Sequence, residues 1–230
     1  MREPGRRMRS HLLDIAVELF KSRGGLSAVS VSEIAQAAEA FPSQVTYYFR
    51  SKEALFVEAA CRDILYTGQQ AEQAASAAPT LALYTRALVQ SVVAAPGLAL
   101  FIDALALTRR RQDLAPLIER TFDRLHAEGD RAYAAIRDLR GWPHDNDQAM
   151  RARGFWALAL GSVLRGAATG LSPSDCASNM LELLRDQQPA AVVPARSGPP
   201  LRVVVPTANA EILWQSEPQP KQKLKQKGPP

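Results

Sequence analysis

Apolar residues recur at helical spacing along most of this 230-residue chain, and short breaks containing glycine or proline separate the runs. From residue 12 to residue 20 they fall three or four positions apart, which indicates a helix with one buried face. Alanine and leucine dominate the apolar residues and favour helices over strands. The sequence therefore predicts an all-α fold of long helices. Breaks are expected near residues 77–79, 96–97, 114–116, 141–144 and 170–173.

The first quarter of the sequence contains several residues typical of helix N-termini, and their close spacing predicts short helices in this region. Ser30 and Glu33 form a capping-box pattern, in which each side chain accepts a hydrogen bond from the other residue's backbone N–H. Pro42 fits the first position of a short third helix, and Ser51 fits the cap of a fourth. Only Glu39-Ala40-Phe41 separates the second helix from the third. A turn this short between two helices is the geometry of a helix-turn-helix.

Charge and composition narrow the class of protein. The chain has 47% hydrophobic residues, enough for a core, and a net charge of +5 that comes from its two ends. A basic end can meet a polyanion, although such ends are also common in proteins that bind no nucleic acid. The two cysteines lack metal-ligand spacing, so a reducing cytoplasm is the expected location. No apolar run approaches the roughly 18 residues that span a bilayer, and the N-terminus lacks the apolar segment of a secretory signal.

Sequence patterns of catalytic sites are missing. There is no metal-ligand cluster, no glycine-rich phosphate loop after a strand and no nucleophile elbow. The three histidines, His11, His126 and His144, are scattered, and none neighbours a cysteine. We therefore expect no catalytic residue, no metal and no cofactor, and a protein that is not an enzyme.

A specific block covers residues 45–56 and reads Val-Thr-Tyr-Tyr-Phe-Arg-Ser-Lys-Glu-Ala-Leu-Phe. It resembles the end of the recognition helix and the start of the next helix in TetR/AcrR-family repressors, and residues 30–38 match that family's second helix. The resemblance covers roughly residues 10–56. Glu39, Phe41 and Thr46 depart from the family pattern, in which glycine, a small capping residue and an aromatic residue are usual at these positions.

The resemblance implies a ligand-responsive transcriptional regulator with an N-terminal helix-turn-helix and a helical ligand-binding and dimerisation domain. Its expected partners are double-stranded DNA, a second copy of the chain and an unknown small-molecule effector, and a membrane is not among them. The implied activity is repression from a palindromic operator bound by a homodimer. The alternative is a helical scaffold protein with a degenerate helix-turn-helix.

Candidates for DNA binding gather on and after the short third helix. They are Ser43, Gln44, Thr46, Tyr47, Tyr48 and Lys52. Val45 and Phe49 share the inner face of this helix, so the first four candidates face outward. Gln44 can pair with adenine through two hydrogen bonds, and Thr46 can meet a thymine methyl group or a phosphate.

The resemblance implies phosphate contacts for Tyr47, Tyr48 and Lys52. Tyr48 as a core residue, and Gln44 and Lys52 as ordinary surface residues, stay open as alternatives. The basic residues at the start of the chain would sweep phosphates or enter a minor groove, or else belong to a frayed terminus. These residues are Arg2, Arg6, Arg7 and Arg9.

The chain is expected to divide into a helix-turn-helix domain over 1–56, a helical effector-binding and dimerisation domain over 57–188, and a tail over 189–230. The tail holds 9 of the chain's 16 prolines and a lysine tract at 221–227. This composition predicts a mostly disordered segment, with a short strand at 201–205 as an open exception.

The helical domain offers candidates for the dimer interface and for the effector pocket. Small residues on a helix over 148–169 suit close approach of two helices, and a helix over 174–185 would complete half of an intermolecular four-helix bundle. These small residues are Gly154, Ala157, Gly161, Gly166 and Ala167. The expected pocket is formed by Phe101, Asp103, Phe122 and Phe155, with Asp103 facing a cationic effector. Ordinary intrachain packing is the alternative for the small residues and for the three phenylalanines. For Asp103 the alternative is a side chain that faces the surface or pairs with an arginine.

Overall fold

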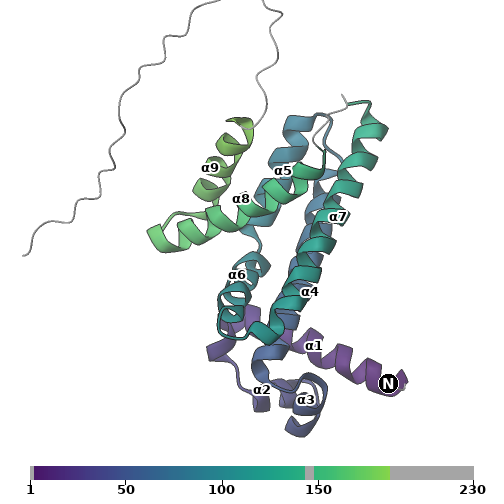
Figure 1. Cartoon of the computed structure of the whole chain (residues 1–230), viewed down its shortest axis with the longest axis vertical. Coiled ribbons are helices and arrows are strands. Elements are labelled where there is room, and N and C mark those ends of the chain that lie inside the picture. The colour runs from purple at the N-terminus through teal and green to yellow at the C-terminus, as the bar shows by residue number, and fades with distance from the viewer. Residues whose placement is uncertain (1–2, 143–147, 187–230) are drawn as a thin grey trace, which may run out of the picture. The chain divides into compact units, whose positions relative to one another are not determined.

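The computed structural model describes residues 3–142 and 148–186, and this part of the chain is helical without a strand (Figure 1). The prediction of an all-α fold is confirmed. The helices are α1 (Glu3–Arg23), α2 (Val31–Ala37), α3 (Pro42–Phe49), α4 (Lys52–Ala75), α5 (Leu81–Ala94), α6 (Pro96–Thr108), α7 (Ala115–Arg140), α8 (Gln148–Thr169) and α9 (Pro173–Asp186). The tail over 189–230, with the segments 201–205 and 221–227, lies outside the described residues.

The predicted caps of the N-terminal helices are confirmed. At the start of α2 the Ser30 hydroxyl accepts from the Glu33 N–H at 3.1 Å, and the Glu33 carboxylate accepts from the Ser30 N–H at 2.7 Å. The Ser30 N–H also holds the pKa of Glu33 below its usual range. Pro42 is the first residue of α3, and the Ser51 hydroxyl caps α4 by accepting from the Ala54 N–H at 3.1 Å. Interactions between residues no more than four positions apart therefore determine where these helices begin.

The turn between α2 and α3 places a side chain where glycine is favoured. Glu39 has φ = 51°, in the left-handed region. The turn is closed by the Ala40 N–H, which donates to the carbonyl of Ala35 at 2.8 Å. Most residues other than glycine lose roughly 1 kcal/mol in this backbone region. The departure from glycine in the sequence therefore coincides with a strained position in the fold.

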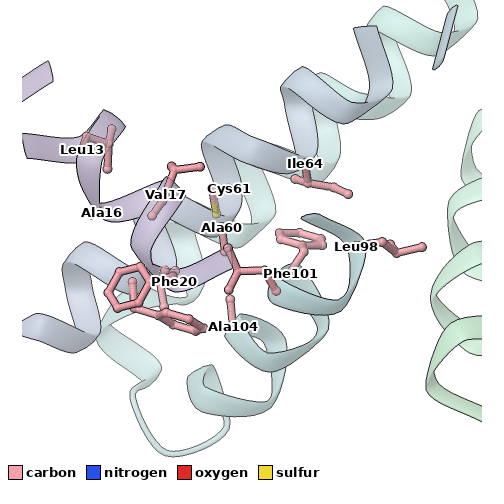
Figure 2. Close-up of a cluster of buried hydrophobic side chains, with 14 of the residues drawn as sticks. Leu13, Ala16, Val17, Phe20, Ala60, Cys61, Ile64, Leu98, Phe101 and Ala104 are labelled. Carbon is pink, nitrogen blue, oxygen red and sulfur yellow. The ribbon is translucent and has the colours of Figure 1, made fainter. Parts of the chain in front are cut away.

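Helix α4 connects the N-terminal helices to the rest of the fold, because it contacts α1, α3, α5, α6 and α7. The boundary predicted after residue 56 falls inside this helix. Figure 2 shows that one buried cluster joins side chains from three helices. Its labelled members are Leu13, Ala16, Val17 and Phe20 of α1, Ala60, Cys61 and Ile64 of α4, and Leu98, Phe101 and Ala104 of α6. The N-terminal helices therefore share a hydrophobic core with α6.

A buried ion pair fixes the same three helices. The Lys21 ammonium of α1 lies 3.2 Å from one carboxylate oxygen of Asp63 on α4, and Asp63 is only 5% exposed. A methyl group on Gly97, at the N-terminus of α6, would overlap the other carboxylate oxygen and the hydroxyl of Thr67. This close approach requires glycine at position 97. The helix N-terminus favours the negative charge placed against it, as Lys21 does on the other side.

Replacing Glu39 with glycine should stabilise the protein by about 0.5–1 kcal/mol, because glycine removes the left-handed strain but adds freedom to the unfolded chain. Urea unfolding of Glu39→Gly measures this gain. Ala37→Gly, in the last helical position before the turn, is the matched control and should lower stability by a similar amount. A loss of stability in Glu39→Gly would contradict the assignment of strain to this residue.

Removing the cation that pairs with the buried Asp63 should destabilise the fold strongly. Lys21→Met leaves the Asp63 carboxylate buried without its partner, and we expect a loss of about 3 kcal/mol in the free energy of unfolding. The double variant Lys21→Met/Asp63→Asn should lose less than the single variant, because the amide carries no charge.

The matched control joins the same two helices at the surface. Asp14 on α1 pairs with Arg62 on α4 at 2.5 Å, and both side chains are about half exposed (52% and 43%). Exposed pairs contribute at most about 1 kcal/mol, so Asp14→Asn should have a small effect in the same urea titration. If Lys21→Met and Asp14→Asn lowered the free energy of unfolding equally, the burial of Asp63 would not make its ion pair more important than the exposed pair.

Candidate nucleic-acid interface

Helix α3 divides into a buried face and an exposed face. Val45 and Phe49 are 1% and 4% exposed and belong to the core, as the sequence predicts. Ser43, Thr46 and Tyr47 are exposed. The core thus holds α3 from one side, and α2 and α4 contact it. Its outward side chains are presented on a rigid support.

Gln44 is half-buried and already has a role in the free protein. Its side-chain oxygen accepts a hydrogen bond from the Phe41 N–H at 2.9 Å, at the N-terminus of α3. This bond satisfies the N–H of the residue before α3, and Phe41 has no polar side chain that could cap the first N–H groups of the helix. Pairing with adenine would use the same oxygen as an acceptor, so the base contact predicted for Gln44 and its capping bond draw on one atom.

The two tyrosines differ in environment. Tyr47 is 78% exposed, whereas Tyr48 is half-buried and packs against the core. Their rings meet edge to face, with 5.1 Å between centroids. This contact orients Tyr47 from its buried neighbour. The packing of Tyr48 corresponds to the core alternative considered for it from the sequence.

Lys52 lies in the first turn of α4 and braces the connection between α1 and α2. Its ammonium donates to the carbonyls of Leu26 and Val29, both at 3.0 Å. An ammonium has three donors, so these bonds leave one for a phosphate. The sequence predicted a cation at this position but not its two carbonyl bonds, because these bonds join residues more than 20 positions apart.

Sequence reasoning missed two exposed residues at the ends of α3. Phe41 precedes the helix and is 74% exposed. Arg50 ends the helix with φ = 67° and is also exposed. The sequence does not reveal the exposure of the Phe41 ring or the left-handed backbone of Arg50, because both depend on the fold.

The basic start of the chain belongs to α1, which begins at Glu3. Arg9 lies 2.5 Å from the Glu58 carboxylate and 4.8 Å from the centre of the Phe49 ring. Arg7 pairs with Glu3 at 3.3 Å. Arg9 therefore ties α1 to α4 and to the buried end of α3. Arg2 lies outside the described residues.

Three of the four residues expected to form an effector pocket belong to one hydrophobic cluster, in which Phe101 is buried and against which Phe122 and Phe155 pack. Phe101 is fully buried, and its ring contacts that of Phe122 at 5.4 Å between centroids. Phe155 contacts the Trp156 ring instead, at 5.7 Å. Asp103 is exposed. Its carboxylate lies close to Gly25, in the connection after α1.

A better-shielded carboxylate in the helical domain belongs to Glu72 of α4. It accepts a hydrogen bond from the hydroxyl of Tyr84, a buried residue of α5. Burial raises the pKa of Glu72 above its usual range. The Tyr84 ring also lies within 6.3 Å of Tyr133 and 5.7 Å of Trp142.

A groove of about 500 Å³ lies between α5 and α9. Leu81, Leu181 and Leu184 give it an apolar lining, with Arg86 and Arg185 at its side. None of the four expected pocket residues lines it. Within residues 3–142 and 148–186, no group of three or more histidine, cysteine or acidic side chains is placed to hold a metal ion.

The small residues of α8 fall on different faces. Gly161 is exposed, and a methyl group there would meet nothing within 4 Å. A methyl group on Gly166 would overlap the Cys176 sulfur of α9. The two glycines that were predicted to face a second copy therefore have different surroundings. Gly166 packs against α9 within the chain, whereas Gly161 lies on an open face of α8. Ala157, Leu164, Arg165 and Ala168 are exposed at compatible helical spacing.

In the described part of the chain, no single helix is long and apolar enough to cross a membrane. Helices α5 and α6 meet the length and composition criteria only as a pair, and the pair is bent by 62°.

Comparisons with known proteins agree with this architecture. The model of the bacterial regulatory proteins of the tetR family matches residues 12–59, and a model of a bacterial transcriptional repressor C-terminal domain matches residues 81–185. No curated protein sequence matches the chain.

Solved structures give the same result. A transcriptional regulator from Rhodococcus sp. RHA1 is 36% identical, with a TM-score of 0.68 over 77% of this chain and 95% of that one. A TetR-family regulator from Mesorhizobium loti MAFF303099 is 19% identical, with a TM-score of 0.60 over 80% and 96% of the two chains. The reduced form of Escherichia coli NemR, also 19% identical, gives 0.56 over 78% and 96%; these two similarities concern the fold alone. The helix-turn-helix, the two family matches and the Rhodococcus relative together show that this chain belongs to the TetR family of transcriptional regulators.

Proposed function

We propose that this protein is a ligand-responsive repressor that binds a palindromic operator as a homodimer. The observation that carries the proposal is the outward face of α3, which is exposed while its inner face is anchored by Val45 and Phe49. A short helix supported in this way can enter a major groove without losing its shape. The cytoplasm, where the chromosome is accessible, is the location that fits this role.

DNA contacts divide into base reading and phosphate binding. Ser43, Gln44 and Thr46 face base edges, whereas Tyr47 and Lys52 contact the backbone. Lys52 has one ammonium donor left beyond its two carbonyl bonds, and it lies at the start of α4, where free N–H groups favour an anion. Tyr48 acts mainly by orienting Tyr47.

The second copy of the chain docks on the open face of α8. Gly161 gives the closest approach, and Leu164, 57% exposed, supplies apolar area that a monomer leaves in water. On the neighbouring α9, Leu183 is 44% exposed. Dimerisation would cover these side chains and double the number of base pairs read.

Effector binding belongs to the helical domain, near the ring pair of Phe101 and Phe122. The Phe101 side of this pair lies in the core shared with α1 and α4. A ligand that displaces α6 would change the packing of Gly97 against Asp63, and Asp63 is paired with Lys21 of α1. This contact gives ligand binding a physical route to the N-terminal helices.

Selection of bound sequences from a random duplex library tests the proposed function. A repressor should enrich an inverted repeat whose half-sites lie about one helical turn apart, or a multiple of it. A scaffold protein with a degenerate helix-turn-helix should enrich no sequence. Titration of the selected duplex against a scrambled duplex at several salt concentrations then gives the specific and nonspecific affinities.

Lys52→Ala should weaken binding to all duplexes alike and reduce the slope of log K against log salt by about one, because one phosphate contact is lost. Gln44→Ala should instead relax the preference at one base pair, at a cost of about 1–3 kcal/mol there. Each variant also loses a bond in the free protein, so urea unfolding is measured beside binding. An unchanged salt slope in Lys52→Ala would show that Lys52 only braces the connection between α1 and α2.

Gly161→Glu should convert the dimer to a monomer while keeping the helical signal, because it places a carboxylate where two helix backbones meet. Operator binding should fall far more than nonspecific binding. Sedimentation of the wild type and the variant measures the change.

Two further variants separate the interface from the fold. Ala127→Glu adds the same charge on an exposed position of α7 and should leave the dimer intact. Gly166→Glu should lower the stability of the chain itself, since it collides with Cys176. A dimeric Gly161→Glu would move the interface away from this face of α8.

A further inference from the structure

The ring of Phe41 stands out from the surface at the N-terminal end of α3. It is 74% exposed, although its backbone is held on both sides: its N–H donates to the Gln44 side chain and its carbonyl accepts from the Gln44 N–H, both at 2.9 Å. The ring therefore projects from a fixed point. An exposed aromatic ring at a fixed point is a contact surface for a partner with apolar groups.

The rest of this face also lacks charge. From residue 40 to residue 49 there is no lysine, arginine, aspartate or glutamate. Arginine or lysine is the usual reader of guanine, and an acidic side chain can accept from cytosine. Neither pairing is available along α3. The available chemistry is a glutamine, which suits adenine, and apolar groups, which suit the methyl group of thymine.

Position favours the same chemistry. In a helix-turn-helix, the N-terminal residues of the recognition helix contact the base edges. Phe41 directly precedes Pro42, the first residue of α3, and both are exposed. Thr46, whose side chain carries a methyl group, lies one turn further along and is also exposed.

We propose that Phe41 is a specificity-determining residue that contacts the C5 methyl group of a thymine in the major groove, and that α3 reads A·T pairs. This inference rests on the proposed function, because it requires α3 to bind in the major groove. Phenylalanine cannot cap the helix through its side chain, so capping does not explain its presence at position 41. A base contact gives this position, where the family usually has a small capping residue, a role in DNA reading.

Replacing thymine with uracil in the selected operator removes the methyl group and leaves the hydrogen-bonding edges unchanged. Each thymine is replaced in turn, in both half-sites, and binding of the full chain is titrated at fixed salt. Wild-type protein should lose about fourfold in affinity for each methyl contact removed. At the thymine that Phe41 contacts, Phe41→Ala should bind the uracil and thymine duplexes equally. On the unmodified operator the dimeric variant loses one such contact in each half-site and should bind about sixteenfold more weakly than wild type.

Two controls locate the effect. Tyr66 on α4 is a second exposed aromatic residue, 57% exposed, and Tyr66→Ala should reproduce the wild-type uracil profile. Thr46→Ser removes only a methyl group and should change sensitivity at a different thymine from that of Phe41. Identical uracil profiles for wild type and Phe41→Ala, with operator binding preserved, would overturn the inference and leave the proposed function standing. Failure of the wild type to select any duplex would overturn both.

Discussion

The ion pair between Lys21 and Asp63 is the interaction on which the placement of the N-terminal helices depends. Apolar packing alone is weakly directional and does not by itself select one register between α1 and α4. A buried carboxylate allows one arrangement, because its charge must remain beside its partner. Gly97 lets the N-terminus of α6 reach the same carboxylate. The Lys21–Asp63 contact therefore acts together with the Arg9–Glu58 and Asp14–Arg62 pairs to place α1 on α4, and it also involves the start of α6.

Helix starts were predictable because their causes are local. Ser30, Pro42 and Ser51 act on backbone groups at most a few residues away, so the sequence contains both partners of each interaction. The inward positions of Val45 and Phe49 follow from helical periodicity in the same way. By contrast, Gly161 and Gly166 both lie on α8, and they differ in that a methyl group would overlap Cys176 only at Gly166. That distinction depends on a contact between two helices.

The candidate site shows the same limit. Sequence reasoning identified the face of α3 that points outward, because the period of the helix is enough for that. It did not identify what Gln44 and Lys52 bind in the free protein, since the Lys52 carbonyl partners are more than 20 residues distant. Of the residues expected to form a pocket, the three phenylalanines share one hydrophobic cluster, whereas Asp103 is exposed. Asp103 occupies an apolar stretch of sequence, but its side of α6 faces outward toward the connection after α1.

The exposed rings of Phe41 and Tyr47 also affect how temperature acts on DNA binding. Covering apolar surface lowers the heat capacity of a complex relative to its free components. The enthalpy of association then becomes more favourable as temperature rises, while the entropy becomes less so. A complex formed by ion release alone lacks this curvature. In the proposed complex, the uncovered aromatic rings of Phe41, before α3, and Tyr47, on α3, therefore contribute to an optimum of DNA affinity in temperature, and a change of either side chain alters that contribution.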